Sequence, residues 1–184
     1  MAEASADNYA VNMMKWLLAS VQIIRGRGDD RRGALASLPQ LSEIFVQQRI
    51  MGAERPILDI YLARARADFD GRDATISVVR KAVNTMTNRG QIGYYIPAVG
   101  ELVALLVDRG TESDLAEAQD AVSKLEAVPA EGSVMRDIWV LRMRTLVARA
   151  HGDESGYREL RDRYREMATS LGFEGHMAWA EAMP

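Results

Sequence analysis

Cysteine and histidine, the side chains that most often serve as nucleophile, general base and transition-metal ligand, are scarce in this 184-residue chain. The sequence holds no cysteine and two histidines, His151 and His176, so thiol nucleophiles, disulfides, thiolate metal sites and multi-histidine metal sites are excluded. His151 comes directly before Gly152, where the negative end of a helix dipole favours a cation. We expect His176 to pack beside Trp179, and an acid–base pair of His176 with Glu174 is the alternative.

The motifs that hold nucleotides or activate hydrolytic nucleophiles are also missing. The sequence contains no GxxxxGKS/T phosphate loop, no HExxH and no GxSxG. Arg31 stands where the glycine-rich stretch that begins at Gly26 would need its third glycine to bind a dinucleotide. The apolar run that ends at Asp108 is in phase with a helix, so we interpret it as a core helix rather than a magnesium-binding strand. The sequence therefore predicts a protein that is not an enzyme, with no catalytic residue, no metal and no cofactor.

The amino-acid composition and net charge exclude further classes of protein. Hydrophobic residues make up 48% and charged residues 27%, which is typical of a globular domain. The formal net charge of -3 argues against general binding to nucleic acid or to an anionic membrane. The most apolar stretch, Met13–Ile24, is too short to cross a bilayer, and the first ten residues carry no positive charge and do not resemble a secretory signal. We expect a cytoplasmic protein.

The helices that must position any functional side chain follow a pattern that is repeated along the chain. Gly71, Gly110 and Gly152 each separate two helical patterns, at intervals of 39 and 42 residues. Each glycine can take the left-handed conformation that ends a helix, and a residue able to cap the next helix follows it: Asp73, Thr111 or Asp153. An apolar stripe with steps of three, four and three residues begins five positions after each glycine. The three stripes are Ile76, Val79, Val83 and Met86; Leu115, Ala118, Val122 and Leu125; and Tyr157, Leu160, Tyr164 and Met167.

This repeat predicts one domain, residues 1–184, that folds as an all-α right-handed superhelix of about four antiparallel helix hairpins. The hairpins are expected at about 7–50, 55–89, 91–127 and 134–171, with a short capping helix over 175–183. Because Val79, Leu115 and Leu160 occupy equivalent positions, we expect all three side chains to be buried.

The hairpins resemble degenerate tetratricopeptide repeats. Small and large packing residues follow the order of that family from Leu102 through Gly110 to Leu125, although most of its signature residues are missing. Residues 55–184 also resemble the C-terminal region of bacterial regulators that join a class III adenylyl cyclase domain and an ATPase domain to helical repeats. Three stretches carry this second resemblance: Gly93–Leu106, Leu115–Leu125 and Leu171–Met183. The resemblance implies a regulatory or scaffolding region whose catalytic residues would lie in other domains.

Two sets of residues are candidates for partner contacts. Tyr94 and Tyr95 open the first helix of a hairpin, and together with Tyr61 and Arg64 they are predicted to line a concave surface that binds a partner protein. The alternatives are that one of the adjacent tyrosines lies in the core and the other at its rim, or that the concave surface senses a small molecule or a peptide.

The first helix is apolar on more than one side. The stripe Met14, Leu17, Val21 and Ile24 is expected to pack on the second helix, while a second set lies off the stripe. That second set is Met13, Trp16 and Ile23. We predict that it forms the interface of a homodimer, and docking onto an upstream domain is the alternative.

Overall fold

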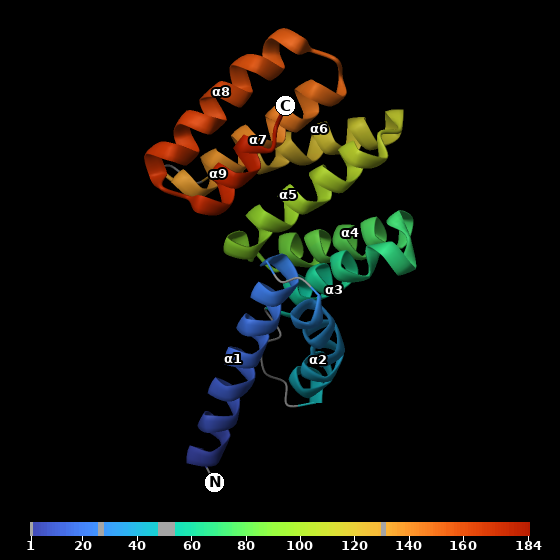
Figure 1. The fold of residues 1–184 in the computed structure, drawn as a ribbon, viewed down its shortest axis with the longest axis vertical. Helices are drawn as coiled ribbons and strands as arrows, with labels where there is room; N and C mark the ends of the chain where they lie inside the picture. Colours follow the sequence, from blue (N-terminus) through green and yellow to red (C-terminus); the bar gives the residue numbers. More distant parts are fainter. Residues whose placement is uncertain (1, 26–27, 48–53, 130–131) are drawn as a thin grey trace. The chain divides into compact units, whose positions relative to one another are not determined.

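The computed structural model describes residues 2–25, 28–47, 54–129 and 132–184, and all the secondary structure in these residues is helical (Figure 1). The predicted all-α class is therefore confirmed for this part of the chain. The helices are α1 (Ala2–Arg25), α2 (Asp29–Gln47), α3 (Arg55–Asp70), α4 (Arg72–Asn88), α5 (Ile92–Arg109), α6 (Glu112–Glu126), α7 (Val134–Ala150), α8 (Glu154–Leu171) and α9 (Glu174–Glu181).

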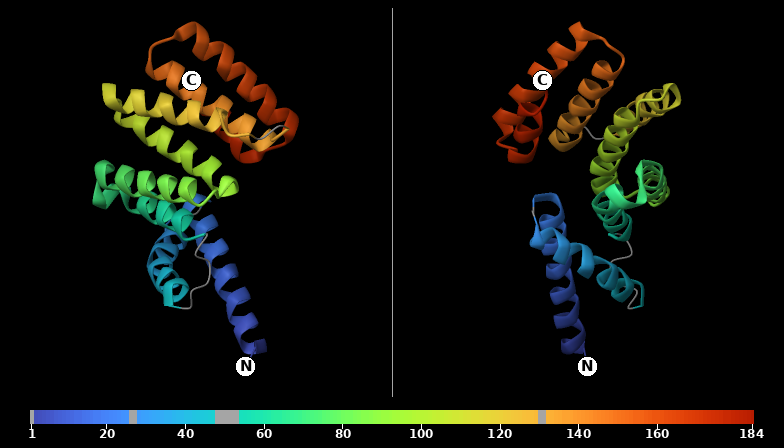
Figure 2. Two further views of the ribbon diagram at one scale, coloured as in Figure 1. Left: turned by 180° about the vertical axis from the view of Figure 1, so that it is seen from behind. Right: turned by 45° about the vertical axis from the view of Figure 1, so that its right-hand side comes forward.

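Contacts between helices divide the chain into two compact units, Met1–Tyr94 and Tyr95–Pro184. In the first unit, α1 packs on α2 and α3, and α3 packs on α4. In the second unit, α6 packs on α7, α7 packs on α8, and the short α9 lies against α8 (Figure 2). No helix among the described residues is long and apolar enough to cross a membrane. The assignment of the whole chain to one repeat domain stays a prediction.

The helix ends follow the local sequence signals closely. Gly71, Gly110 and Gly152 all have positive φ, of 83°, 72° and 73°, as predicted for residues that separate helices. Asp153 caps α8, because its carboxylate accepts a hydrogen bond from the Gly156 N–H at 3.0 Å. The expected cap at Asp73 is wrong, since Gly71 is the N-cap residue of α4 and Asp73 already lies in its first turn.

The turn between α5 and α6 carries the most extensively bonded cap. The Thr111 hydroxyl accepts a hydrogen bond from the Asp114 N–H, and the Asp114 carboxylate accepts one from the Thr111 N–H, both at 3.2 Å. This is the capping box that the sequence predicts. Arg109, at the end of α5, also donates two hydrogen bonds to the Asp114 carboxylate, which is 1% exposed. A single buried carboxylate therefore joins the end of one helix to the start of the next.

The first helix packs with the opposite face from the one predicted. Trp16 and Ile23 are buried, with exposed fractions of 7% and 8%, whereas Met14, Leu17 and Val21 are exposed. Met13 is half-buried, and the side chain of Ile24 lies outside the described residues. Both side chains therefore lie in the core of their own chain and leave little surface for a partner, and the oligomer interface at Met13, Trp16 and Ile23 stays a prediction. The face around Trp16 carries small side chains, including Ala19 and Ser20, and small residues let neighbouring helices approach closely.

In the second unit, α5 and α7 approach each other at a glycine. The ring of Trp139 on α7 lies so close to Gly100 on α5 that a Cβ atom added there would be 2.1 Å from the ring atom Cζ3. Trp139 is itself 6% exposed, so its ring has little space into which it can move. Only glycine at position 100 permits this contact.

We therefore expect Gly100→Ala to destabilise the protein by at least about 2 kcal/mol, because the added methyl group overpacks a rigid contact. Urea unfolding followed by circular dichroism would measure the change. Gly93→Ala, in the same helix, is the matched control: a Cβ there has no neighbour within 4 Å, and the substitution should be neutral or stabilise by up to about 1 kcal/mol. Equal stability of the two variants would contradict this account of the α5–α7 contact.

Candidate partner-binding groove

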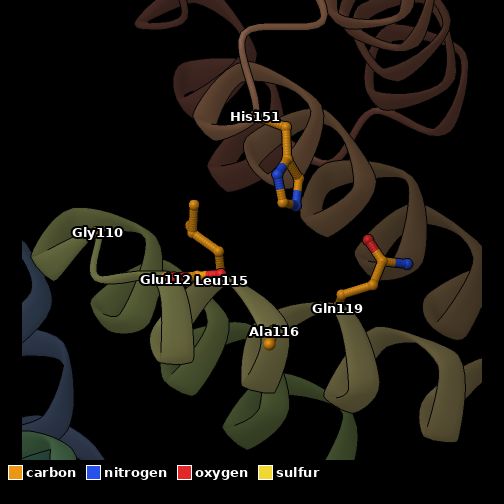
Figure 3. A pocket seen from close by; sticks show the side chains of 6 residues that line it. All are labelled: Gly110, Glu112, Leu115, Ala116, Gln119 and His151. Carbon is orange, nitrogen blue, oxygen red and sulfur yellow. The ribbon is translucent and has the colours of Figure 1, made fainter.

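Two adjoining hollows lie on the surface of the second unit. The larger, of about 590 Å³, is lined by the α5–α6 turn, by α6 and by His151 at the end of α7 (Figure 3). The smaller, of about 250 Å³, shares Gln119 and His151 with it. We call the two hollows together the α6 groove. Its lining residues are Gly110, Glu112, Leu115, Ala116, Gln119, Val122, Arg144, Val147, Ala148, His151, Asp153 and Leu160.

The groove is built by two helix faces that have the same residue spacing. On α6 the row Glu112, Leu115, Ala116 and Gln119 lines the groove, and on α7 the row is Arg144, Val147 and Ala148, continued by the C-cap residue His151. Val122 on α6 and Leu160 on α8 line the smaller hollow beside these two rows. Each set has the spacing i, i+3, i+4 and i+7, which places its members along one side of a helix. Each set also starts with a charged residue, continues with two apolar residues and ends with a polar one. The apolar middle of the groove is therefore bounded by polar groups on both helices.

Two residues that the sequence predicts to be buried line the groove instead. Val79 is fully buried as predicted, but Leu115 and Leu160 are only half-buried. Both leucines line the groove, so one side of each side chain packs on the core while the other faces the hollow. The prediction that all three residues are core residues is wrong for these two, because the apolar stripe includes part of a concave surface.

Two charged groups at the rim, Arg144 and Asp153, have interactions that fix their positions. Arg144 forms an ion pair with Glu126, in which Nε lies 2.5 Å from the carboxylate. The Gly156 N–H and the Ser155 hydroxyl donate to the Asp153 carboxylate and lower its pKa. His151 is the C-cap residue of α7, the position that the sequence predicts, and its ring projects into the hollow (Figure 3). The groove thus presents an apolar floor and a polar rim, and two of the charged groups at this rim are held in place.

The tyrosines and the arginine that the sequence proposes as a binding surface are divided between the two units. Tyr61 and Arg64 lie on α3 in the first unit, where Tyr61 is half-buried and Arg64 is exposed. Tyr94 also belongs to the first unit and is half-buried; burial raises the pKa of its hydroxyl, and Glu54 acts in the same direction. Tyr95 belongs to the second unit and is 8% exposed, which favours a role in packing.

The second histidine lies in an aromatic cluster formed by α7, α8 and α9. The ring centroid of His176 lies 5.1 Å from that of Trp179, as the sequence predicts, and equally far from that of Trp139. Its Nδ1 atom is hydrogen-bonded to the Tyr164 hydroxyl at 2.8 Å, so the contact that the structure gives it is not the acid–base pair with Glu174. The Arg142 guanidinium carbon stacks over the Trp179 ring at 4.3 Å from its centroid. The cluster fastens α9 to the rest of its unit.

Burial controls the proton equilibria of this cluster. It lowers the pKa of His176 to about 4, and the positive charge of Arg142 acts in the same direction. It raises the pKa of Tyr164 to about 12. Both side chains are therefore neutral at pH 7, and at 7% and 0% exposure they are not accessible to a substrate. We interpret the pair as a structural contact.

No group of three or more acidic or histidine side chains among the described residues is placed to hold a metal ion. Comparisons with protein-family models, with curated proteins and with solved structures found no match.

The α6 groove could not be found from the sequence, because which faces of α6 and α7 lie opposite each other depends on packing between segments that are separate in the chain. The only available signal was the shared spacing of the two helix faces.

The shifted pKa of His176 predicts a loss of stability in mild acid. The folded state binds this proton with a pKa of about 4 and the unfolded chain with one near 6.5, so stability is complete above about pH 6.5 and declines as the pH falls toward 4. The loss attributable to this group should be about 2–3 kcal/mol between pH 7.5 and pH 4.5. The measurement is the free energy of unfolding in urea across this range.

His176→Phe is the control, because it keeps an aromatic ring and removes the titrating group. This variant should be less stable than the wild type at pH 7.5, since it leaves the buried Tyr164 hydroxyl without its hydrogen bond. Its free energy of unfolding should then change much less with pH. An identical pH dependence in the two proteins would show that His176 is not the responsible group.

Proposed function

We propose that the chain is a non-enzymatic interaction module that binds a segment of a partner protein in the α6 groove. The observation that carries the proposal is the pair of equally spaced helix faces, with apolar residues in the middle and charged or polar residues at the ends. Protein grooves of this kind accept an amphipathic segment whose apolar side chains enter the floor while its polar groups meet the rim. Glu112 on α6 and Arg144 on α7 would give such a segment a preferred direction.

The wider architecture that we propose is a tetratricopeptide-like right-handed superhelix of about four hairpins, capped by α9. The packing of α1 on α2, of α3 on α4 and of α7 on α8 supports this arrangement, because consecutive helices are the units of helical repeats. In such an array the module would serve a cytoplasmic signalling protein, with a cyclase or ATPase domain elsewhere as the resemblance implies. Binding at the α6 groove differs from the expected use of a wall of first helices alone, since the groove combines α6, a second helix in this scheme, with α7, a first helix.

A small-molecule sensor is the second candidate. Its support is the position of Gln119 and His151, whose side chains project from different helices toward the same apolar hollow (Figure 3). Ligand sites in proteins commonly combine an apolar lining with a few such polar groups. Binding of a peptide and binding of a small molecule would use the same surface, so one variant can test both.

The test is selection of linear peptides of about twelve residues from a displayed library against the wild-type chain. Ala116 is exposed and lines the groove, so Ala116→Arg should fill the groove without disturbing the core. Selected peptides should bind this variant at least about 10-fold more weakly than the wild type, which is the loss of one good anchor contact. Fluorescence polarisation would give the dissociation constants.

Ala74→Arg, an equally exposed helical alanine on α4, is the matched control and should leave the affinity unchanged. Peptides that bind Ala116→Arg as tightly as the wild type would place the binding surface elsewhere. Failure to select any peptide, combined with small-molecule stabilisation that Ala116→Arg abolishes, would favour the sensor.

A further inference from the structure

The exposed apolar side chains of the described residues are concentrated on α1. Ten large hydrophobic side chains are exposed, and six of them belong to this helix, while the other four are divided among α4, α5 and α7. The six are Tyr9, Val11, Met14, Leu17, Leu18 and Val21. A helix of a soluble protein ordinarily has one apolar face, so a second apolar face in water indicates a contact with something else.

Four of these residues have the spacing of a coiled coil. Val11, Met14, Leu18 and Val21 are separated by three, four and three positions, which makes them the a and d residues of two heptads. Their exposed fractions are 48%, 65%, 59% and 52%. We call this row the α1 seam.

The seam points away from the core of its own unit. In the same heptads, the buried residues occupy only the b, c and f positions, which lie on the opposite side of the helix from a and d. These buried residues are Asn12, Trp16, Ala19, Ser20 and Ile23. Figure 1 shows that the first turns of α1 also extend past α2. The seam is therefore accessible along its whole length within its unit.

We propose that α1 pairs with α1 of a second copy of the chain through this seam, as a short parallel coiled coil. An a/d row packs its side chains into the spaces of a partner helix that presents the same row, and a second copy supplies such a helix by symmetry. The proposal is independent of the groove, which belongs to the other unit. It also differs from the sequence-based interface in the residues it uses.

The charge on the flank of the seam selects the orientation. Lys15 occupies an e position, and in an antiparallel pair e residues face each other, so the Lys15 side chains of the two copies would meet. In a parallel pair, an e residue faces a g residue, which for Lys15 is Ala10. Leu17, another g residue, would then cover the edge of the seam beside Gln22. The parallel arrangement avoids the repulsion of like charges.

Sedimentation equilibrium of the full chain tests the pairing. The wild type should form dimers at high micromolar concentration, and Leu18→Glu should raise the dissociation constant at least about 10-fold by placing a charge in the seam. Val78→Glu replaces an exposed apolar residue on α4 and is the matched control, which should leave the dissociation constant unchanged. A wild type that remains monomeric, or an equal weakening by both variants, would overturn the proposal.

The absence of cysteine from the sequence allows a second test, by cross-linking. In a parallel pair, Leu18→Cys should form a disulfide-linked dimer under mild oxidation, because the two a positions meet across the seam. Val78→Cys is the control and should form no disulfide-linked dimer in the same reaction time. Cross-linking that appears only when Met14→Cys and Leu18→Cys proteins are mixed would overturn the parallel arrangement, since a meets d in an antiparallel pair.

Discussion

The second unit depends on one buried carboxylate at the turn between α5 and α6. Asp114 accepts hydrogen bonds from Arg109 at the end of α5 and from the Thr111 N–H at the start of α6. The bond from Arg109, together with those from Thr111, holds the pKa of this carboxyl well below its usual range, although burial acts in the opposite direction. A charged group in this position is stable only because each of its partners is fixed by a helix end. The geometry of this α5–α6 turn then sets the direction of α6 relative to α5.

The α6 groove begins at that turn. Gly110 has positive φ and forms one end of the groove, and Glu112 and Leu115 follow it on the first turns of α6. A change in the direction of α6 would therefore alter the whole lining on that side. The opposite side ends at His151, the C-cap residue of α7, so both walls are fixed at helix termini whose geometry is set by local hydrogen bonds. The groove is consequently a preformed surface, which lowers the entropic cost of binding a flexible segment.

The contact of α7, α8 and α9 in the same unit is held by aromatic packing instead of by a buried charge. Trp139, Trp179 and His176 meet edge to face, and Tyr164 is hydrogen-bonded to the imidazole ring. The chain end is held on α8 as well, because the Tyr157 hydroxyl donates to the Pro184 carbonyl oxygen at 2.7 Å. These contacts bury a titratable ring in its neutral form. The unit therefore gains a dependence on pH at a place remote from the groove.

The sequence by itself determined the helical class, the positions of the turns and much of the capping. These features depend on residues within a few positions of one another: a glycine with positive φ, a threonine and an aspartate three residues apart, and an apolar period near 3.6. It could also identify one neighbour of His176, since Trp179 lies one turn away on the same helix, but not Trp139 or Tyr164, which come from α7 and α8.

Only the tertiary structure decided which apolar face became core. Both faces of α1 are apolar enough to be buried, and the face of Trp16 was covered because its small neighbours let other helices approach. Likewise, Val79 is enclosed while Leu115 and Leu160 line a groove, although their local patterns are the same. Periodicity fixes which residues share a side of a helix, but what covers that side depends on the shapes of segments far away in the chain.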